Sequence, residues 1–167
     1  MGTGTIIFVL VVLIGIVLPI VLLNSKKKNK EKQFIKTLFD LAEKNNCKIS
    51  EHNLWNNTLI GIDKETRKLF FIRKTDNNLT TNEIDLSEIQ KCRIVKSNRI
   101  VNNKDSENNV VDKLELSFAF RDTKKSETIL EFYNTNRDNL TVYRELQLIE
   151  KWSELVNATI AVINQKK

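Results

Sequence analysis

Apolar and polar side chains alternate strictly between Lys113 and Arg121. The apolar positions are Leu114, Leu116, Phe118 and Phe120. Successive side chains of a strand point to opposite faces, so this period of two predicts a strand with one buried face and one solvated face.

Six further short segments predict strands, because each holds β-branched or aromatic residues and is bounded by polar breaks. These segments are Lys48–Trp55, Thr58–Asp63, Lys68–Lys74, Thr80–Leu86, Gln90–Ser97 and Ser126–Tyr133. Residues Asn102–Asn109 contain no apolar side chain and predict an exposed loop. The middle of the chain therefore predicts seven short antiparallel strands.

Two other segments follow the spacing of a helix. Lys30–Asn45 places apolar side chains three and four residues apart, and Asn45-Asn46 is a plausible stop because Asn tolerates a left-handed cap. The region from about Arg137 to Ile163 predicts a long amphipathic helix with a single main apolar stripe. The stripe consists of Val142, Leu146, Ile149, Trp152, Val156, Ile160 and Ile163.

The chain begins with an uncharged apolar run over residues 5–23. Nineteen residues of helix reach about 28 Å, which is close to the hydrocarbon thickness of a bilayer. A cleaved signal peptide is the alternative. It is disfavoured because no basic segment precedes the run, the run is long, and no small-x-small site follows it. Residues 1–24 are therefore predicted to be a transmembrane anchor.

Five lysines follow this run and no charged side chain precedes it. They are Lys26, Lys27, Lys28, Lys30 and Lys32. Because positive charge stays on the cytoplasmic side, the sequence predicts a single-pass protein with its N-terminus outside and its domain in the cytoplasm. Residues 25–46 then form a basic helical stalk, whose lysines contact anionic headgroups.

The net charge of +6 does not indicate nucleic-acid binding. Residues 24–45 carry seven Lys against three acidic side chains, whereas residues 46–167 carry 20 basic and 18 acidic side chains. The basicity therefore belongs mainly to the stalk. Aromatic residues are not interleaved with the basic ones, so we expect no nucleic-acid partner.

Seven strands followed by a helix with a buried Trp form a restricted arrangement, carried here by Trp152 within LIEKWSELV. A second signal is the stretch IDLSEIQKCRI, where one strand runs through a tight corner into the next. Its predicted core positions are Ile84, Leu86, Ile89, Cys92 and Ile94. Over residues 48–165 the chain resembles the pleckstrin-homology-like superfold, including its GRAM and bacterial branches.

The resemblance implies a mainly β (α+β) fold: a seven-stranded antiparallel barrel capped by the C-terminal helix, within a domain over residues 47–167. It does not imply phosphoinositide binding. Family members that bind these lipids use Lys and Arg around the loop between the first two strands. Here that loop is Trp55-Asn56-Asn57-Thr58, with Lys48 as the nearest base.

The sequence offers little for catalysis. His52 is the single histidine, Cys47 and Cys92 are the two cysteines, and the four glycines are not clustered. No metal-ligand spacing or phosphate-binding loop is present, so we expect no enzyme, no metal and no cofactor. In a cytoplasmic domain the thiols stay reduced, whereas the opposite orientation would permit a Cys47–Cys92 bridge.

The sequence therefore predicts a membrane-tethered, non-enzymatic binding or scaffold module with a protein partner. The alternative is a module that senses anionic lipid through basic strands and the stalk. A weak candidate for its anionic-ligand face is formed by Lys91, Arg93 and Lys96.

Overall fold

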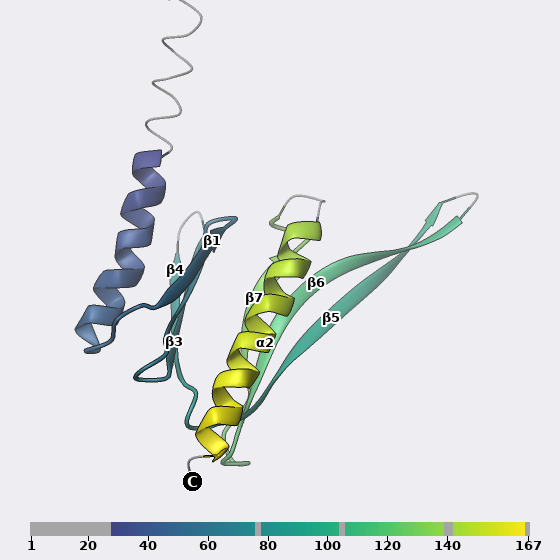
Figure 1. Cartoon of the computed structure of the whole chain (residues 1–167). Coiled ribbons are helices and arrows are strands. Elements are labelled where there is room, and N and C mark those ends of the chain that lie inside the picture. Colours follow the sequence, from purple (N-terminus) through teal and green to yellow (C-terminus); the bar gives the residue numbers. More distant parts are fainter. Residues whose placement is uncertain (1–27, 76–77, 104–105, 139–141, 166–167) are drawn as a thin grey trace, which may run out of the picture.

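The computed structural model describes residues 28–75, 78–103, 106–138 and 142–165, with only the backbone described for residues 100–103 and 106–109. A helix over residues 28–44, called here the N-terminal helix, comes first. Seven strands and one more helix follow (Figure 1). They are β1 (Glu51–Trp55), β2 (Thr58–Asp63), β3 (Lys68–Lys74), β4 (Leu79–Asp85), β5 (Ile89–Asn103), β6 (Ser106–Phe120), β7 (Thr128–Asn134) and α2 (Tyr143–Gln165).

The strands form two antiparallel sheets in simple chain order. One sheet has the order β1-β2-β3-β4 and the other β5-β6-β7. The strands over Thr58–Asp63 and Lys68–Lys74 lie where the sequence pattern predicts them. The sheets face each other, and α2 lies along the three-stranded sheet (Figure 1).

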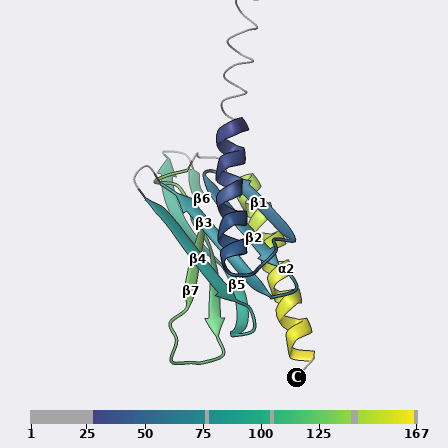
Figure 2. The same cartoon turned by 90° about the vertical axis from the view of Figure 1, so that its left-hand side faces the viewer.

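The four-stranded sheet is covered on both faces, and all six residues of β2 are buried. Alternate side chains of β2 serve two cores: Leu59 packs in a small cluster beneath the N-terminal helix, and Ile60 in the main core. Figure 2 shows the N-terminal helix lying across this sheet. The helix thus docks on the domain through Leu38 and Ala42, which are both buried.

The main core fills the space between the two sheets and α2. Trp152 is fully buried at its centre. The buried apolar positions of α2 are Ile149, Trp152, Val156, Ile160 and Ile163, all members of the predicted stripe. Truncating a buried Trp to Ala typically costs about 3–5 kcal/mol, so this side chain is a principal anchor of α2.

The prediction of a closed seven-stranded barrel is wrong. The strands stay in two separate sheets, and β4 and β5 belong to different ones. The reason lies at the corner between them, where the N–H of Glu88 donates to the carbonyl of Asp85 (3.1 Å) and the N–H of Ile89 to that of Leu86 (3.3 Å). This tight turn redirects the chain into the second sheet, and the apolar residues of the corner still point into the core.

The predicted exposed loop over Asn102–Asn109 is also wrong. Here β5 and β6 continue as a paired hairpin out to Asn103 and Ser106. Figure 1 shows this hairpin projecting beyond the rest of the molecule. A β ladder is held by backbone hydrogen bonds, so two antiparallel strands can extend through a sequence without apolar residues.

The structure also contradicts the predicted single-pass membrane protein with a cytoplasmic domain. In the part of the chain that it describes, no helix combines the length and the apolar character that a bilayer span needs. The N-terminal helix is interrupted on its exposed face by charges such as Lys32, Lys36 and Asp40. The anchor predicted over residues 1–24 lies outside the described residues.

Candidate functional site

A groove of about 900 Å³ lies where three elements meet. The start of the N-terminal helix, the turn between β1 and β2, and the first turns of α2 each contribute side chains to it. Phe34, Leu54, Trp55 and Leu148 supply apolar surface, and polar or charged side chains supply the rest. An adjoining cavity of about 630 Å³ shares Lys30, Phe34 and Lys74 with it, so the two form one elongated groove.

The turn between β1 and β2 presents two asparagines to this groove. Asn56 and Asn57 both have positive φ, at 35° and 57°, and Trp55 pairs with Thr58 across them. Two-residue hairpins favour such left-handed turns because their twist matches that of the strands, and Asn accepts this conformation better than most residues. The Asn-Asn dipeptide therefore holds two side-chain amides at the tip of the hairpin.

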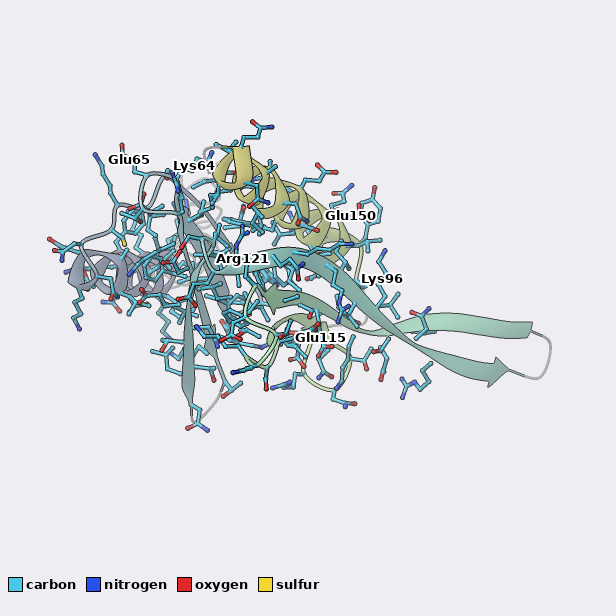
Figure 3. All side chains as sticks on the ribbon, turned by 90° about the horizontal axis from the view of Figure 1, so that it is seen from below. Lys64, Glu65, Lys96, Glu115, Arg121 and Glu150 are labelled. Atoms are coloured by element: carbon cyan, nitrogen blue, oxygen red, sulfur yellow. The ribbon has the colours of Figure 1, made fainter. Side chains whose placement is uncertain are left out.

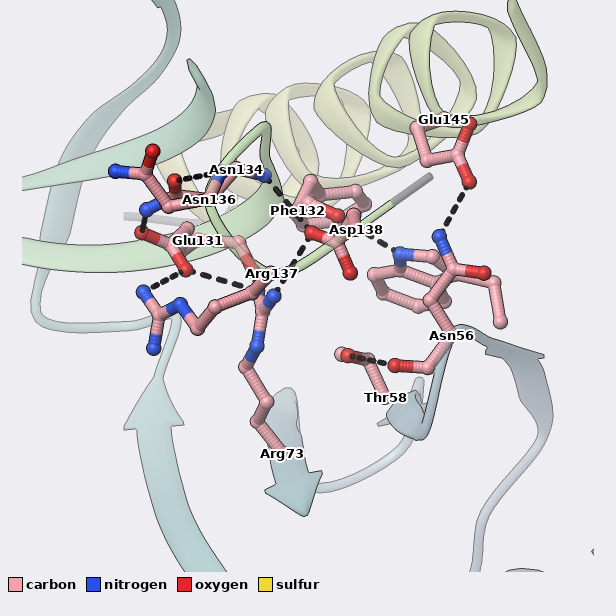
Figure 4. Close-up of polar contacts among 11 residues, drawn as sticks. Asn56, Thr58, Arg73, Glu131, Phe132, Asn134, Asn136, Arg137, Asp138 and Glu145 are labelled. Carbon is pink, nitrogen blue, oxygen red and sulfur yellow. Dashed lines mark hydrogen bonds and ion pairs between the residues drawn. The ribbon is translucent and has the colours of Figure 1, made fainter. Parts of the chain in front are cut away.

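Glu145 lies in the first turn of α2 and lines the groove, although it is only 6% exposed. Its Oε1 accepts a hydrogen bond of 2.7 Å from Nδ2 of Asn56, as Figure 4 shows. Its Oε2 is buried and has no hydrogen-bond partner. A carboxylate near a helix N-terminus is favoured by the helix dipole. That effect does not supply the missing hydrogen bond, and buried polar atoms without a partner are rare.

Two tryptophans fix the wall beside the groove. Nε1 of Trp55 donates to the carbonyl of Phe132 at 2.9 Å, and the two rings stack with centroids 4.7 Å apart. Nε1 of Trp152 donates to Oδ1 of Asn53 at 3.0 Å. Strand β1 is thereby tied to β7 through one tryptophan and to α2 through the other.

A buried ion-pair network continues this wall (Figure 4). The Arg73 guanidinium contacts Oδ2 of Asp138 at 3.0 Å and Oε1 of Glu131 at 3.1 Å, and it donates to the Glu131 carbonyl at 2.7 Å. Oδ2 of Asp138 also accepts from the N–H of Asn134 at 2.8 Å. Arg73 belongs to β3 and its partners to β7 and the turn after it, so the network joins the two sheets.

The rim of the groove carries more basic than acidic side chains, with Glu31 as the exposed acidic residue of its described lining. Among the described residues, Lys30, Lys74 and Arg144 line it without an ion pair within 4.0 Å. Lys151 also lines it, but its ammonium lies 2.8 Å from Oε1 of Glu51. This pairing and its partner Lys64 lower the pKa of the Glu51 carboxyl, since both hydrogen bonds favour its charged form. The three unpaired cations leave the rim open to anionic groups.

Of the lysines predicted to contact membrane, Lys28, Lys30 and Lys32 are exposed on the N-terminal helix, whereas Lys26 and Lys27 lie outside the described residues. Lys30 alone of the described three lines the groove. Their contact with lipid stays a prediction.

The weak candidate face of Lys91, Arg93 and Lys96 lies on β5, on a different element from the groove. All three side chains are exposed. Nη2 of Arg93 lies 2.7 Å from a carboxylate oxygen of Glu127, and Nζ of Lys96 lies 3.8 Å from Oε1 of Glu150 (Figure 3). Acidic neighbours thus accompany two of the three bases.

Sequence reasoning missed Glu145, Asn56, Lys74 and Arg144 as one site, because they come from three separate segments. One signal was available for Glu145. It interrupts the apolar stripe of α2 between Val142 and Ile149, a position where the helix faces the core. An acidic residue at such a position is rarely buried without a partner.

The residues considered for catalysis lie apart. His52 is exposed and packs edge-on against Phe39, with ring centroids 5.3 Å apart. Cys47 lies in the cluster under the N-terminal helix and Cys92 in the main core, and both thiols are free. Burial raises the pKa of the Cys92 thiol to about 12. Within the described ranges, no group of three His, Cys, Asp or Glu side chains is arranged to hold a metal ion.

In comparisons with known proteins, no family model, no curated protein and no solved structure matches this chain.

Proposed function

We propose that this protein is a non-enzymatic binding module that holds an extended peptide of a partner protein in the groove between the N-terminal helix, the β1–β2 turn and α2. The elongated shape of the groove carries this proposal. Two cavities of about 900 and 630 Å³ share Lys30, Phe34 and Lys74. A small-molecule site usually encloses its ligand in one pocket, whereas two adjoining cavities offer a surface along which an extended chain can lie.

The chemistry of the groove supports a peptide. Apolar side chains such as Phe34 and Leu148 can receive side chains of the ligand, while the amides of Asn53 and Asn57 offer hydrogen bonds to a backbone. Of the described residues that line the larger cavity, none is Ser, Thr, Cys or His. The larger cavity thus offers amide, ammonium, guanidinium and carboxylate groups suited to recognition, and the adjoining cavity adds the hydroxyls of Thr37 and Thr75.

The order of four strands, three strands and a closing helix supports kinship with the pleckstrin-homology-like superfold, here as an open pair of sheets. Proteins of one superfold host many functions, so the groove and not the fold carries the functional proposal.

The test is selection of a displayed random-peptide library on the full chain, followed by NMR mapping of a synthetic hit. We expect amide shifts at Asn56, Asn57 and Gln147. We also expect Lys74→Glu to weaken binding and Lys124→Glu, an exposed lysine in the β6–β7 turn, to leave it unchanged. Shifts confined to another surface, or equal binding by both variants, would refute the groove as the site.

A second candidate function is recognition of anionic lipid. It is favoured by the exposed lysines of the N-terminal helix, Lys28, Lys30, Lys32 and Lys36. It requires salt-sensitive co-sedimentation with anionic vesicles that exceeds binding to neutral vesicles. Equal sedimentation with both vesicle types would remove this candidate and leave the peptide module.

A further inference from the structure

We infer that the groove selects an acidic peptide segment that carries one Lys or Arg, with Glu145 pairing the cationic side chain and the basic rim pairing its acidic neighbours. This inference rests on the proposed function and adds the chemical class of the ligand. Its two halves come from two different features of the groove.

The first feature is the incomplete hydrogen bonding of Glu145. The carboxylate is 6% exposed, and Oε2 has no partner although Oε1 has one. A buried carboxylate oxygen without a donor is unfavourable, and a ligand donor that reaches the carboxylate once Asn56 moves aside would remove that penalty. Because charge-assisted hydrogen bonds are the strongest of their kind, an ammonium or guanidinium is the best donor for this position.

The second feature is the single partner that Glu145 already has. Asn56 is exposed, belongs to the tip of the hairpin, and donates one N–H to Oε1 at 2.7 Å. A neutral amide offers one of its two N–H groups here, whereas an ammonium offers three donors and a guanidinium five. Asn56 therefore acts as a placeholder that a ligand cation displaces from the carboxylate.

The charge of the rim determines which residues must flank the Lys or Arg of the ligand. Lys30, Lys74 and Arg144 line the same groove without an ion pair among the described residues, and they outnumber Glu31, the exposed acidic residue of that lining. An isolated cation would be repelled by these three charges. Acidic residues on either side of the Lys or Arg would instead meet them, so the complementary segment has alternating charge.

The experiment uses pools of acetylated and amidated octapeptides with one fixed central residue, acidic residues on both sides of it, and random outer positions. The central residue is Lys, Arg, norleucine, Gln or Glu, and binding to the full chain is measured by fluorescence anisotropy. We expect the Lys and Arg pools to bind about tenfold or more tightly than the norleucine pool, which keeps the aliphatic chain and lacks the charge.

Two variants, each with a matched control, test whether the preference for Lys and Arg arises at Glu145 and Asn56. Glu145→Gln keeps an acceptor for Asn56 but removes the charge, so the preference for Lys and Arg should disappear, while Glu154→Gln on the exposed side of α2 should preserve it. Asn56→Gly keeps the left-handed turn and removes the competing amide, so binding of the Lys pool should tighten. Asn57 also has a positive φ but does not donate to Glu145, so Asn57→Gly should not produce that gain.

The outcomes separate the inference from the proposed function. If all pools bind the groove equally, or if the preference survives in Glu145→Gln, the inference fails and the peptide module stands. If no pool and no library peptide binds, the proposed function itself fails and the inference with it. Loss of binding by Glu145→Gln counts only if its urea midpoint matches that of Glu154→Gln.

Discussion

Asn157 of α2 forms two hydrogen bonds with the backbone of Cys92 in β5. Its Oδ1 accepts from the Cys92 N–H at 3.1 Å, and its Nδ2 donates to the Cys92 carbonyl at 2.9 Å. One side-chain amide thereby takes the place that a neighbouring strand would occupy. The helix covers the edge of β5 at this point and satisfies backbone groups that would otherwise attract another chain.

Replacing Asn157 with Ala should destabilise the fold by about 1–3 kcal/mol, because it leaves a backbone donor and acceptor without partners. Urea unfolding followed by tryptophan fluorescence measures the loss. Asn98→Ala, an exposed asparagine farther along β5, is the control and should stay within about 0.5 kcal/mol of the native chain. Equal midpoints for the two variants would show that the Asn157 amide contributes nothing.

Gly61→Ala should loosen the N-terminal helix. A Cβ at position 61 would lie 2.9 Å from Cδ2 of Leu38 and 3.3 Å from two carbons of Ile49. Overpacking of this kind costs about 1–3 kcal/mol. We expect faster hydrogen exchange over residues 28–44, and we expect the double variant with Leu38→Ala to lose less stability than the sum of the two single losses. Strict additivity would mean that the contact is not the cause.

The stability that the Arg73 ion-pair network contributes should depend on both carboxylates being present with the guanidinium. Asp138→Ala removes one of the two carboxylates that pair the guanidinium and should cost about 1.5–3 kcal/mol, because Glu131 still pairs it while the Asp138 hydrogen bonds are lost. The double variant Arg73→Met with Asp138→Ala no longer leaves that guanidinium behind and should recover part of the loss. Thermal unfolding of the native chain, both single variants and the double variant gives the coupling energy. A double variant as unstable as the sum of its parts would contradict the pairing.

Burial of Cys92 gives a prediction for pH. Its pKa is raised from 9.0 to about 12, so the folded state keeps the proton longer than the unfolded state does. The protonated thiol makes its full contribution to the free energy of unfolding below about pH 9. That contribution is lost as the pH rises towards 12, at up to about 1.4 kcal/mol per pH unit. Cys92→Ala should flatten this slope in urea titrations between pH 8.5 and 10.5. An identical slope would refute the assignment.

The sequence predicted burial correctly where apolar side chains recur with the regular spacing of a strand or of a helix. Leu114, Leu116 and Phe118 alternate because β6 has one covered face, and Trp152 is buried because it lies on the stripe of α2. The hairpin over Asn102–Asn109 was missed because its ladder depends on backbone pairing, which leaves no apolar signal. The barrel was wrong because closure depends on pairing between distant strands, and a local pattern at the 85–89 corner is compatible with either outcome.

The groove could not be predicted from the sequence because its residues come from segments that are far apart in the chain. Asn56 and Glu145 are 89 residues apart, and nothing in either segment indicates that one would donate to the other. Lys30 was predicted as a lipid contact because it belongs to a basic run, yet in the fold it lies beside Lys74 in the lining of the same cavities. These residues come together only because the N-terminal helix packs on the four-stranded sheet and α2 packs along the three-stranded sheet that faces it.

The outer part of the long β5–β6 hairpin should have a lower local stability than the core strands. Strand β7 pairs with β6 only between Lys113 and Phe118, and the β5–β6 register shifts between Ser97 and Asn98. Beyond that shift the two strands pair only with each other, and a two-stranded ribbon is marginal in water. Its amides should exchange with solvent through local opening that leaves the core intact, whereas those of β2 and β3 should exchange only through global unfolding.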